Sequence, residues 1–148
     1  MKKSPFLKAI ICIGVLICSV ILVFHACEAY DKYRLLNYYS NKDNFVETSG
    51  VVTHISYDEK FHALHLGFNN MELIFSDDDF EITGKNVDLI YARSFEDKIH
   101  IGDTVTFISA TGYFWDGYSM PIVGLTVDRE VLLEFEEGYA NLMEWLKE

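Results

Sequence analysis

The sequence predicts a mainly β fold, in which an N-terminal transmembrane helix is followed by a small five-stranded barrel with one short internal helix and a C-terminal amphipathic helix. Three observations lead to this fold class. Residues 9–26 carry no formally charged side chain, apolar and polar residues alternate in several runs between positions 45 and 127, and apolar residues after position 134 repeat at helical spacing. Alternation is typical of strands, whereas repeats of three or four residues are typical of helices.

The first expected element is an apolar helix that begins behind Lys2, Lys3 and Lys8. A helix over residues 6–26 would be about 31 Å long, which matches the hydrocarbon thickness of a bilayer. Lysines ahead of such a segment favour a cytoplasmic N-terminus and place the remainder outside. We therefore expect residues 1–27 to form a cytoplasmic tip and a transmembrane helix, with membrane lipid as its partner.

Two other interpretations of this segment stay open. A secretory signal also begins with basic and then apolar residues, and the small residues near Cys27 and Ala29 would permit cleavage. Alternatively, Cys27 follows the small residue Ala26 and could carry a lipid. The anchor and the lipid would both keep the protein at the membrane.

The composition of the chain narrows the classes of partner. It has 12 basic and 23 acidic residues, a formal net charge of −11, and three of the basic residues precede the apolar segment. An acidic surface repels phosphate backbones, which bind proteins through lysine and arginine, so we expect no nucleic-acid partner. The cysteines are Cys12, Cys18 and Cys27, so the later domain cannot form an internal disulfide and must rely on its core.

Residues 28–44 are expected to form a juxtamembrane stalk and hinge. Four tyrosines in this segment suit the headgroup region of a membrane, and the polar residues 40–44 break the helix. The folded domain then covers residues 45–148.

The first three strands are predicted from alternation and from one turn. A strand over residues 45–57 should bend or bulge at Gly50 and place Val51, Thr53, Ile55 and Tyr57 on one face. Asn69 and Asn70 suit a two-residue hairpin turn. That register would pair Phe68 with Met71, Leu66 with Leu73 and Leu64 with Phe75 on one apolar face, and residues 80–82 would continue the third strand.

A short helix and a second hairpin should follow. Val87, Ile90 and Tyr91 have helical spacing, with Asn86 as N-cap. Residues 99–108 return to a strand, and a turn at residues 116–117 would pair Ala110 with Val123 and Ile108 with Leu125. Because that register leaves Val105 and Phe107 on the opposite face, we expect a bulge near residues 109–112, which would bring both sets inward.

This order of elements is that of the five-stranded OB barrel. Residues 49–55 (SGVVTHI) as a bent first strand, residues 101–106 (IGDTVT) before the fourth, and the tyrosine-rich stalk complete the pattern. On these features the chain resembles small bacterial membrane-anchored proteins with a tRNA-anticodon-binding-like OB domain. The resemblance covers roughly residues 30–127. It implies an OB fold and an extracytoplasmic ligand-binding module at the bacterial cell membrane, but not tRNA binding, which the acidic surface disfavours.

The C-terminus departs from that pattern. Residues 134–147 predict an amphipathic helix with one apolar stripe, formed by Phe135, Tyr139, Leu142, Met143 and Leu146. We expect this helix to pack against the barrel. The alternative is a helix that binds a partner.

The candidate partner-binding residues lie at the tip of the second hairpin: Tyr113, Phe114, Trp115, Tyr118 and Met120. In OB barrels the loop between strands 4 and 5 borders the usual binding face, and aromatic rings there offer a large contact area. The alternative is that these rings pair within the hairpin or pack on the C-terminal helix.

The sequence shows no catalytic triad context, phosphate-binding loop, dinucleotide fingerprint or Cys-x-x-Cys pair. His62 would face Asp77 in the predicted hairpin, and residues 77–79 are three aspartates, but we expect surface groups there and no metal or cofactor. We therefore expect a non-catalytic binding module for an envelope protein or glycan. A structural subunit of an envelope assembly, or an enzyme with an unrecognised site, is the alternative.

Overall fold

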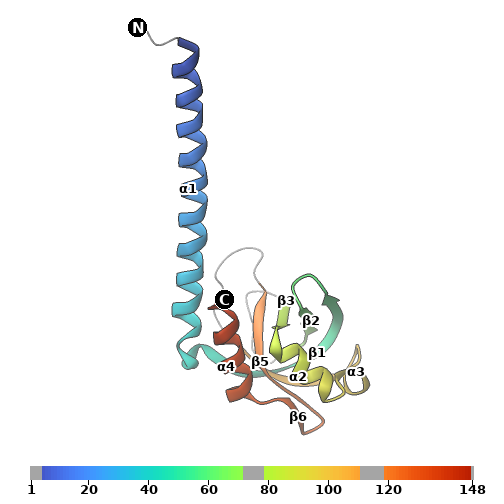
Figure 1. The fold of residues 1–148 in the computed structure, drawn as a ribbon. Coiled ribbons are helices and arrows are strands. Elements are labelled where there is room, and N and C mark those ends of the chain that lie inside the picture. The colour runs from blue at the N-terminus through green and yellow to red at the C-terminus, as the bar shows by residue number, and fades with distance from the viewer. Residues whose placement is uncertain (1–4, 72–78, 111–118, 148) are drawn as a thin grey trace. The chain divides into compact units, whose positions relative to one another are not determined.

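The computed structural model describes residues 5–71, 79–110 and 119–147, with the side chains of α1 described from Cys12 onward. It divides into two units, Met1–Leu35 and Leu36–Glu148. Figure 1 shows the elements. In chain order they are α1 (Pro5–Tyr39), η1 (Lys42–Asn44), β1 (Phe45–Asp58), β2 (Ala63–Asn69), β3 (Asp79–Thr83), α2 (Lys85–Ala92), α3 (Phe95–Lys98), β4 (Thr104–Ala110), β5 (Met120–Val127), β6 (Glu130–Leu133) and α4 (Phe135–Trp145).

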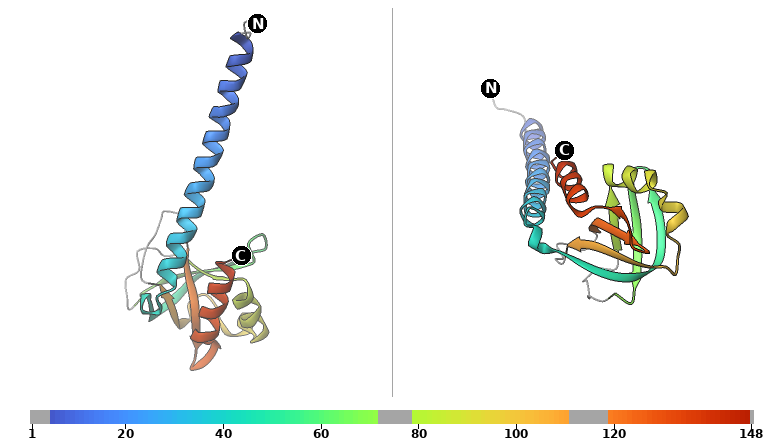
Figure 2. Two further views of the ribbon diagram at one scale, coloured as in Figure 1. Left: turned by 60° about the vertical axis from the view of Figure 1, so that its left-hand side comes forward. Right: turned by 90° about the horizontal axis from the view of Figure 1, so that it is seen from below.

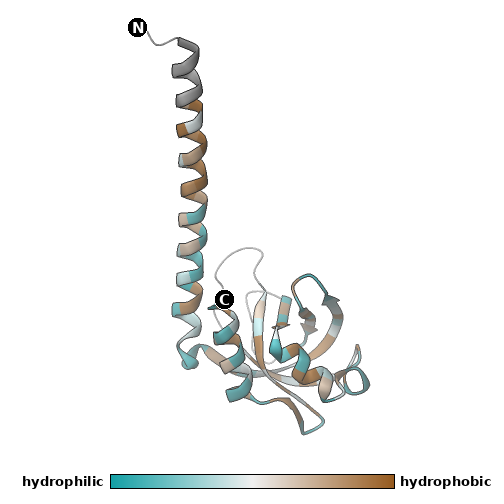
Figure 3. Ribbon diagram, viewed as in Figure 1, coloured by the Kyte–Doolittle hydropathy of each residue, from teal (hydrophilic) through white to brown (hydrophobic). Residues whose placement is uncertain are grey.

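Helix α1 is long and apolar enough to cross a membrane, by its length and composition. In the described part of this helix, Cys12–Tyr39, the residues of the most apolar window are not buried inside the protein. Figure 3 shows the apolar residues gathered in the part of α1 that follows its first turns, with polar residues increasing toward Tyr39. A signal sequence near the N-terminus would meet the same criterion, so the cleavage alternative stays open.

The second unit is built on a six-stranded sheet in the order β3-β2-β1-β4-β5-β6. These neighbours pair antiparallel. The long strand β1 makes this possible, because residues 45–51 pair with β4 and residues 51–58 pair with β2. In addition, β3 pairs with β5 in parallel through Phe80–Met120 and Glu81–Pro121. The coarse prediction, an apolar N-terminal helix followed by a mainly β fold with helices, is confirmed.

The predicted register of the first hairpin is wrong. Strand β2 pairs with residues 79–83, so Leu64 lies opposite Ile82 and Leu66 opposite Phe80, in place of Phe75 and Leu73. Phe80 and Ile82 are both 0% exposed, and the Phe80 ring lies 5.0 Å from that of Phe107. By alternation alone, residues 73–75 and residues 80–82 could both pair with β2. The second set fills the core, and this determines the register.

The inward face of β1 also differs from the prediction. The register with β2 shifts between Val52 and His54, so the bulge lies two to three residues beyond Gly50. One extra residue changes which side chains point inward: Val52 is buried before the bulge, Ile55 packs on the core after it, and Thr53 is exposed. Gly50 has another role, because a Cβ there would lie 3.1 Å from Phe68 Cβ.

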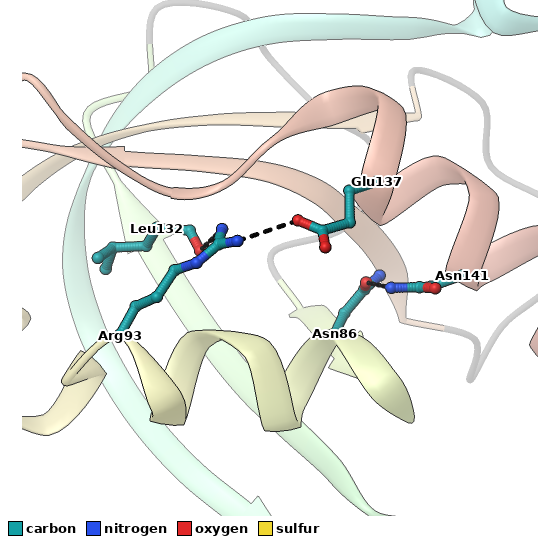
Figure 4. Close-up of polar contacts among 5 residues, drawn as sticks. All are labelled: Asn86, Arg93, Leu132, Glu137 and Asn141. Atoms are coloured by element: carbon teal, nitrogen blue, oxygen red, sulfur yellow. Dashed lines mark hydrogen bonds and ion pairs between the residues drawn. The ribbon is translucent and has the colours of Figure 1, made fainter.

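Helix α2 confirms the predicted helical spacing, since Val87 and Ile90 are buried on one side. Asn86, however, is not its N-cap, because the helix begins after Gly84. The Asn86 side chain is 1% exposed and bridges to α4. Its Nδ2 donates to the carbonyl oxygen of Gly138 at 2.9 Å, and its Oδ1 accepts from Asn141 Nδ2 at 2.9 Å, as Figure 4 shows for the second bond. A buried amide that holds another helix outweighs local capping here.

The bulge expected in the second hairpin is confirmed, with the register shifting between Ile108 and Ser109. Ile108 therefore lies opposite Gly124, one place from the predicted Leu125. Val105 and Phe107 join the core, as the bulge was expected to allow. The expected turn at residues 116–117 lies within residues 111–118, which are outside the described residues.

Strand β6 was not predicted. It joins β5 through Asp128 and Arg129, which have φ angles of 48° and 70°, and Val127 pairs with Glu130 across this two-residue turn. Turns of this kind need positive φ at both central residues and favour Asn and Gly. Arg129 is the second central residue of this turn, and an arginine at that position does not predict a hairpin turn from the sequence.

Helix α4 packs on β5, as expected for the C-terminal helix, and Figure 2 shows the two side by side in both views. The contact is close because a Cβ at Gly138 would lie 2.1 Å from the carbonyl oxygen of Val123. Arg93, which immediately follows α2, donates to Leu132 O at 2.9 Å and to Glu137 Oε2 at 3.1 Å (Figure 4). With the core on one face and α4 on the other, β5 is buried along almost its whole length.

Candidate functional site

Four of the five predicted partner-binding residues, Tyr113, Phe114, Trp115 and Tyr118, lie outside the described residues. The fifth, Met120, is described and is not at the surface. It is 2% exposed, opens β5 and belongs to the core cluster. Met120 pairs with Phe80. Its side chain therefore belongs to the inward-facing residues of β5 and not to the hairpin tip that precedes the strand.

Beside the start of β5 the outer surface of the sheet is polar. Ser56, His65 and Glu81 lie in register across β1, β2 and β3, on the side opposite the buried Leu64 and Ile82. Asp79 shares this side, two residues before Glu81. We call the surface formed by Ser56, His65, Asp79 and Glu81 the polar face.

Hydrogen bonds and close charges connect the polar face to its surroundings. Ser119, which immediately precedes β5, donates to Asp79 Oδ2 at 3.1 Å, and His65 Nδ1 lies 3.7 Å from Asp79 Oδ1. At the other side, the Nε2 atom of His54 and the Ser56 hydroxyl lie 3.0 Å apart. The face therefore offers imidazole, carboxylate and hydroxyl groups to a ligand.

Glu81 is the most perturbed acid of the face. Burial raises the pKa of its carboxyl to about 7, with a further increase from Asp79 and an opposing decrease from His65. Tyr39 also interacts electrostatically with Glu81. The charge of the polar face therefore changes near neutral pH.

The connection from β1 to β2 carries an exposed aromatic residue that the sequence analysis did not single out. Phe61 is 61% exposed, and the Lys60 ammonium lies 4.6 Å from the centre of its ring. Asp58 Oδ1 accepts hydrogen bonds from the backbone N–H groups of Lys60 at 2.8 Å and Phe61 at 3.2 Å. This short turn holds the ring outward. A single phenylalanine between Lys60 and His62 gives no pattern, so only the structure reveals it.

In the described part of the chain, His62 lies between Asp88 and Tyr57. Asp77 lies outside the described residues, and His62 Nε2 lies 3.0 Å from Asp88 Oδ1 on α2. Its other ring nitrogen, Nδ1, lies 2.7 Å from the hydroxyl oxygen of Tyr57. Within residues 5–71, 79–110 and 119–147, no group of three or more histidine, cysteine, aspartate or glutamate side chains could hold a metal ion.

Comparisons with protein-family models, with curated proteins and with solved structures found no match to this chain.

Proposed function

We propose that this protein is a single-pass, membrane-anchored and non-catalytic binding module of the bacterial cell envelope, whose domain lies on the extracytoplasmic side and recognises an envelope protein or glycan. One observation carries the proposal. The polar face lies across β1, β2 and β3, between the connection that presents Phe61 and the start of β5, before which the sequence places four aromatic residues.

The strand pairings support an OB-like barrel as the finer description of the domain. They lead from β1 through β2, β3, β5 and β4 back to β1, and α2 lies between β3 and β4 in the chain. In OB folds the outer face of strands 2 and 3, together with the loops that join strands 1 to 2 and 4 to 5, binds oligonucleotides and oligosaccharides. The polar face and Phe61 occupy the corresponding places.

The chemistry of the surface favours an uncharged or cationic ligand. The chain carries a formal net charge of −11, and the polar face itself contains Asp79 and Glu81. Such a surface repels polyanions. Aromatic rings pack against apolar faces of a ligand, while carboxylate, imidazole and hydroxyl groups hydrogen-bond its hydroxyl or amine groups. A neutral glycan or a protein surface fits both conditions.

Crosslinking in intact cells tests this function. A photoreactive residue is placed at position 115, at position 61, or at Ile101 as the control. Ile101 is 67% exposed in the connection before β4, which contributes no residue to the polar face. We expect positions 115 and 61 to capture the same envelope protein or glycan, and position 101 not to capture it. Capture of unrelated species at all three positions, or of none, would contradict the proposal.

A further inference from the structure

Tyr57, His62 and Asp88 form a continuous chain of hydrogen-bonding groups on the surface. The Tyr57 oxygen lies 2.7 Å from His62 Nδ1, and His62 Nε2 lies 3.0 Å from Asp88 Oδ1. The three residues come from the end of β1, from the connection before β2 and from α2. A nucleophile, a base within hydrogen-bond distance of it, and a third group that orients the base are the arrangement found in enzymes that use activated nucleophiles.

The chemistry of the three groups fixes the direction of the hydrogen bonds. An aspartate carboxylate accepts hydrogen bonds but has no proton to donate, so Nε2 of His62 must carry the ring proton. In the neutral imidazole the other nitrogen, Nδ1, is then an acceptor, and the Tyr57 hydroxyl donates to it. The phenolic proton of Tyr57 therefore points at a free basic nitrogen.

The backbone holds this arrangement in place. His62 has a φ angle of 48°, in the left-handed region that few residues other than glycine adopt. Its carbonyl oxygen accepts from the N–H of Gly84 at 3.1 Å, immediately before α2, the helix that carries Asp88. On the other side, Asp58 fixes the turn that precedes His62. Left-handed backbone held by its surroundings is a feature of functional sites.

We propose that Tyr57 is a nucleophilic modification site that is O-acylated by activated esters or thioesters. The Tyr57 oxygen forms a bond to the carbonyl carbon of the donor, and the bond from that carbon to its alkoxide or thiolate group breaks. The phenolic proton moves to His62 Nδ1 and then to the leaving group, which departs as an alcohol or thiol. Asp88 orients His62 and stabilises the imidazolium that forms in between.

The surroundings favour an acyl donor over a phosphoryl donor. Phosphoryl donors are polyanions, which the net charge of −11 repels. Tyr57 instead has aromatic neighbours: the ring of Tyr91 lies 6.2 Å away in an edge-on arrangement, and exposed Phe61 precedes His62. Uncharged aryl or acyl groups pack well against such rings.

The test uses the full chain in detergent micelles and p-nitrophenyl acetate as the acyl donor, with peptide mass mapping after an acid quench. We expect acetylation of Tyr57 at least about tenfold faster than that of any other tyrosine, because a positioned general base contributes about 10²–10⁴ in rate. Tyr57→Phe should remove the acetyl group from this peptide. His62→Asn, which retains a residue that tolerates positive φ, should lower the Tyr57 rate at least about tenfold.

His100→Gln is the matched control. His100 also faces an aspartate, with Nδ1 3.5 Å from Asp103 Oδ2, but it is not the partner of Tyr57. This variant should leave the Tyr57 rate unchanged. Equal acetylation of Tyr57 and the other tyrosines in the unmodified protein would overturn the proposal, as would a His62→Asn variant that melts like wild type and reacts as fast.

Discussion

At the scale of single residues, Glu81 lies among charged and titratable groups from several parts of the fold. His65 faces it from β2, Asp79 lies on its own strand, and Tyr39 interacts with it from the end of α1. Burial is the largest influence and raises its pKa to about 7. The folded protein therefore binds a proton at Glu81 more tightly than the unfolded chain does.

This shift predicts a pH dependence of stability. Between about pH 4.5 and 7 the folded state holds more protons than the unfolded state, so the contribution of Glu81 to stability is largest below this range and is lost as the pH rises through it. Glu81→Gln removes the titration. We expect the melting temperature of the variant, relative to wild type, to increase from about pH 4.5 to about pH 7 and then to level off.

Ile101→Gln, at an exposed position before β4 that carries no titratable group, is the control and should show a constant difference from wild type across the same range. If Glu81→Gln also showed a constant difference, the raised pKa of Glu81 would be refuted.

The individual site residues were only partly predictable. The sequence placed Met120 at the surface because it follows four aromatic residues closely, but its position in the strand alternation puts it in the core. Phe61 and the Tyr57–His62–Asp88 chain were missed. Asp88 lies 26 residues from His62, and only the correct register of β2 and the position of α2 bring the two together. Local patterns carry no such information.

At the scale of elements, the existence of most helices and strands followed from periodicity, whereas their registers did not. Leu64 and Leu66 would pair equally well with residues 73–75 or 80–82 by alternation alone, and the packing of Phe80 with Phe68 and Phe107 decides between them. Strand β6 was missed because its turn contains Arg129 at positive φ.

The docking of α4 on β5 gives a prediction at this scale. Gly138 lies so close to Val123 that an added Cβ would meet the carbonyl oxygen of Val123 at 2.1 Å. The backbone cannot easily move to relieve so short a contact. We expect Gly138→Ala to lower the free energy of unfolding by about 1–3 kcal/mol, as overpacking does, and the melting temperature by roughly 5–15 °C.

A helix that is free to bind a partner would respond in the opposite direction, since replacing glycine by alanine stabilises an exposed helix by roughly 0.5–1 kcal/mol. Ala140→Gly, at an exposed position of the same helix, is the control and should destabilise by about 1 kcal/mol in either case. A stabilised Gly138→Ala variant would refute the docking of α4.

At the scale of the whole molecule, the sequence predicted the two parts, an apolar N-terminal helix and a mainly β domain, because each part has a strong periodic signal. The return of the pairings to β1 depends on two residue pairs between β3 and β5, Phe80–Met120 and Glu81–Pro121. These strands are far apart in the chain, and no local pattern predicts their contact. The polar face was not predictable for the same reason.

The central claim is that α1 anchors the protein and that the acidic domain folds outside the cytoplasm. It is tested most directly by the compartment in which a reporter fused after Glu148 is active, using one reporter that works only outside the cytoplasm and one that works only inside. We predict activity of the first alone, in membranes that keep the fusion after carbonate extraction. Activity of the second reporter alone would contradict the account.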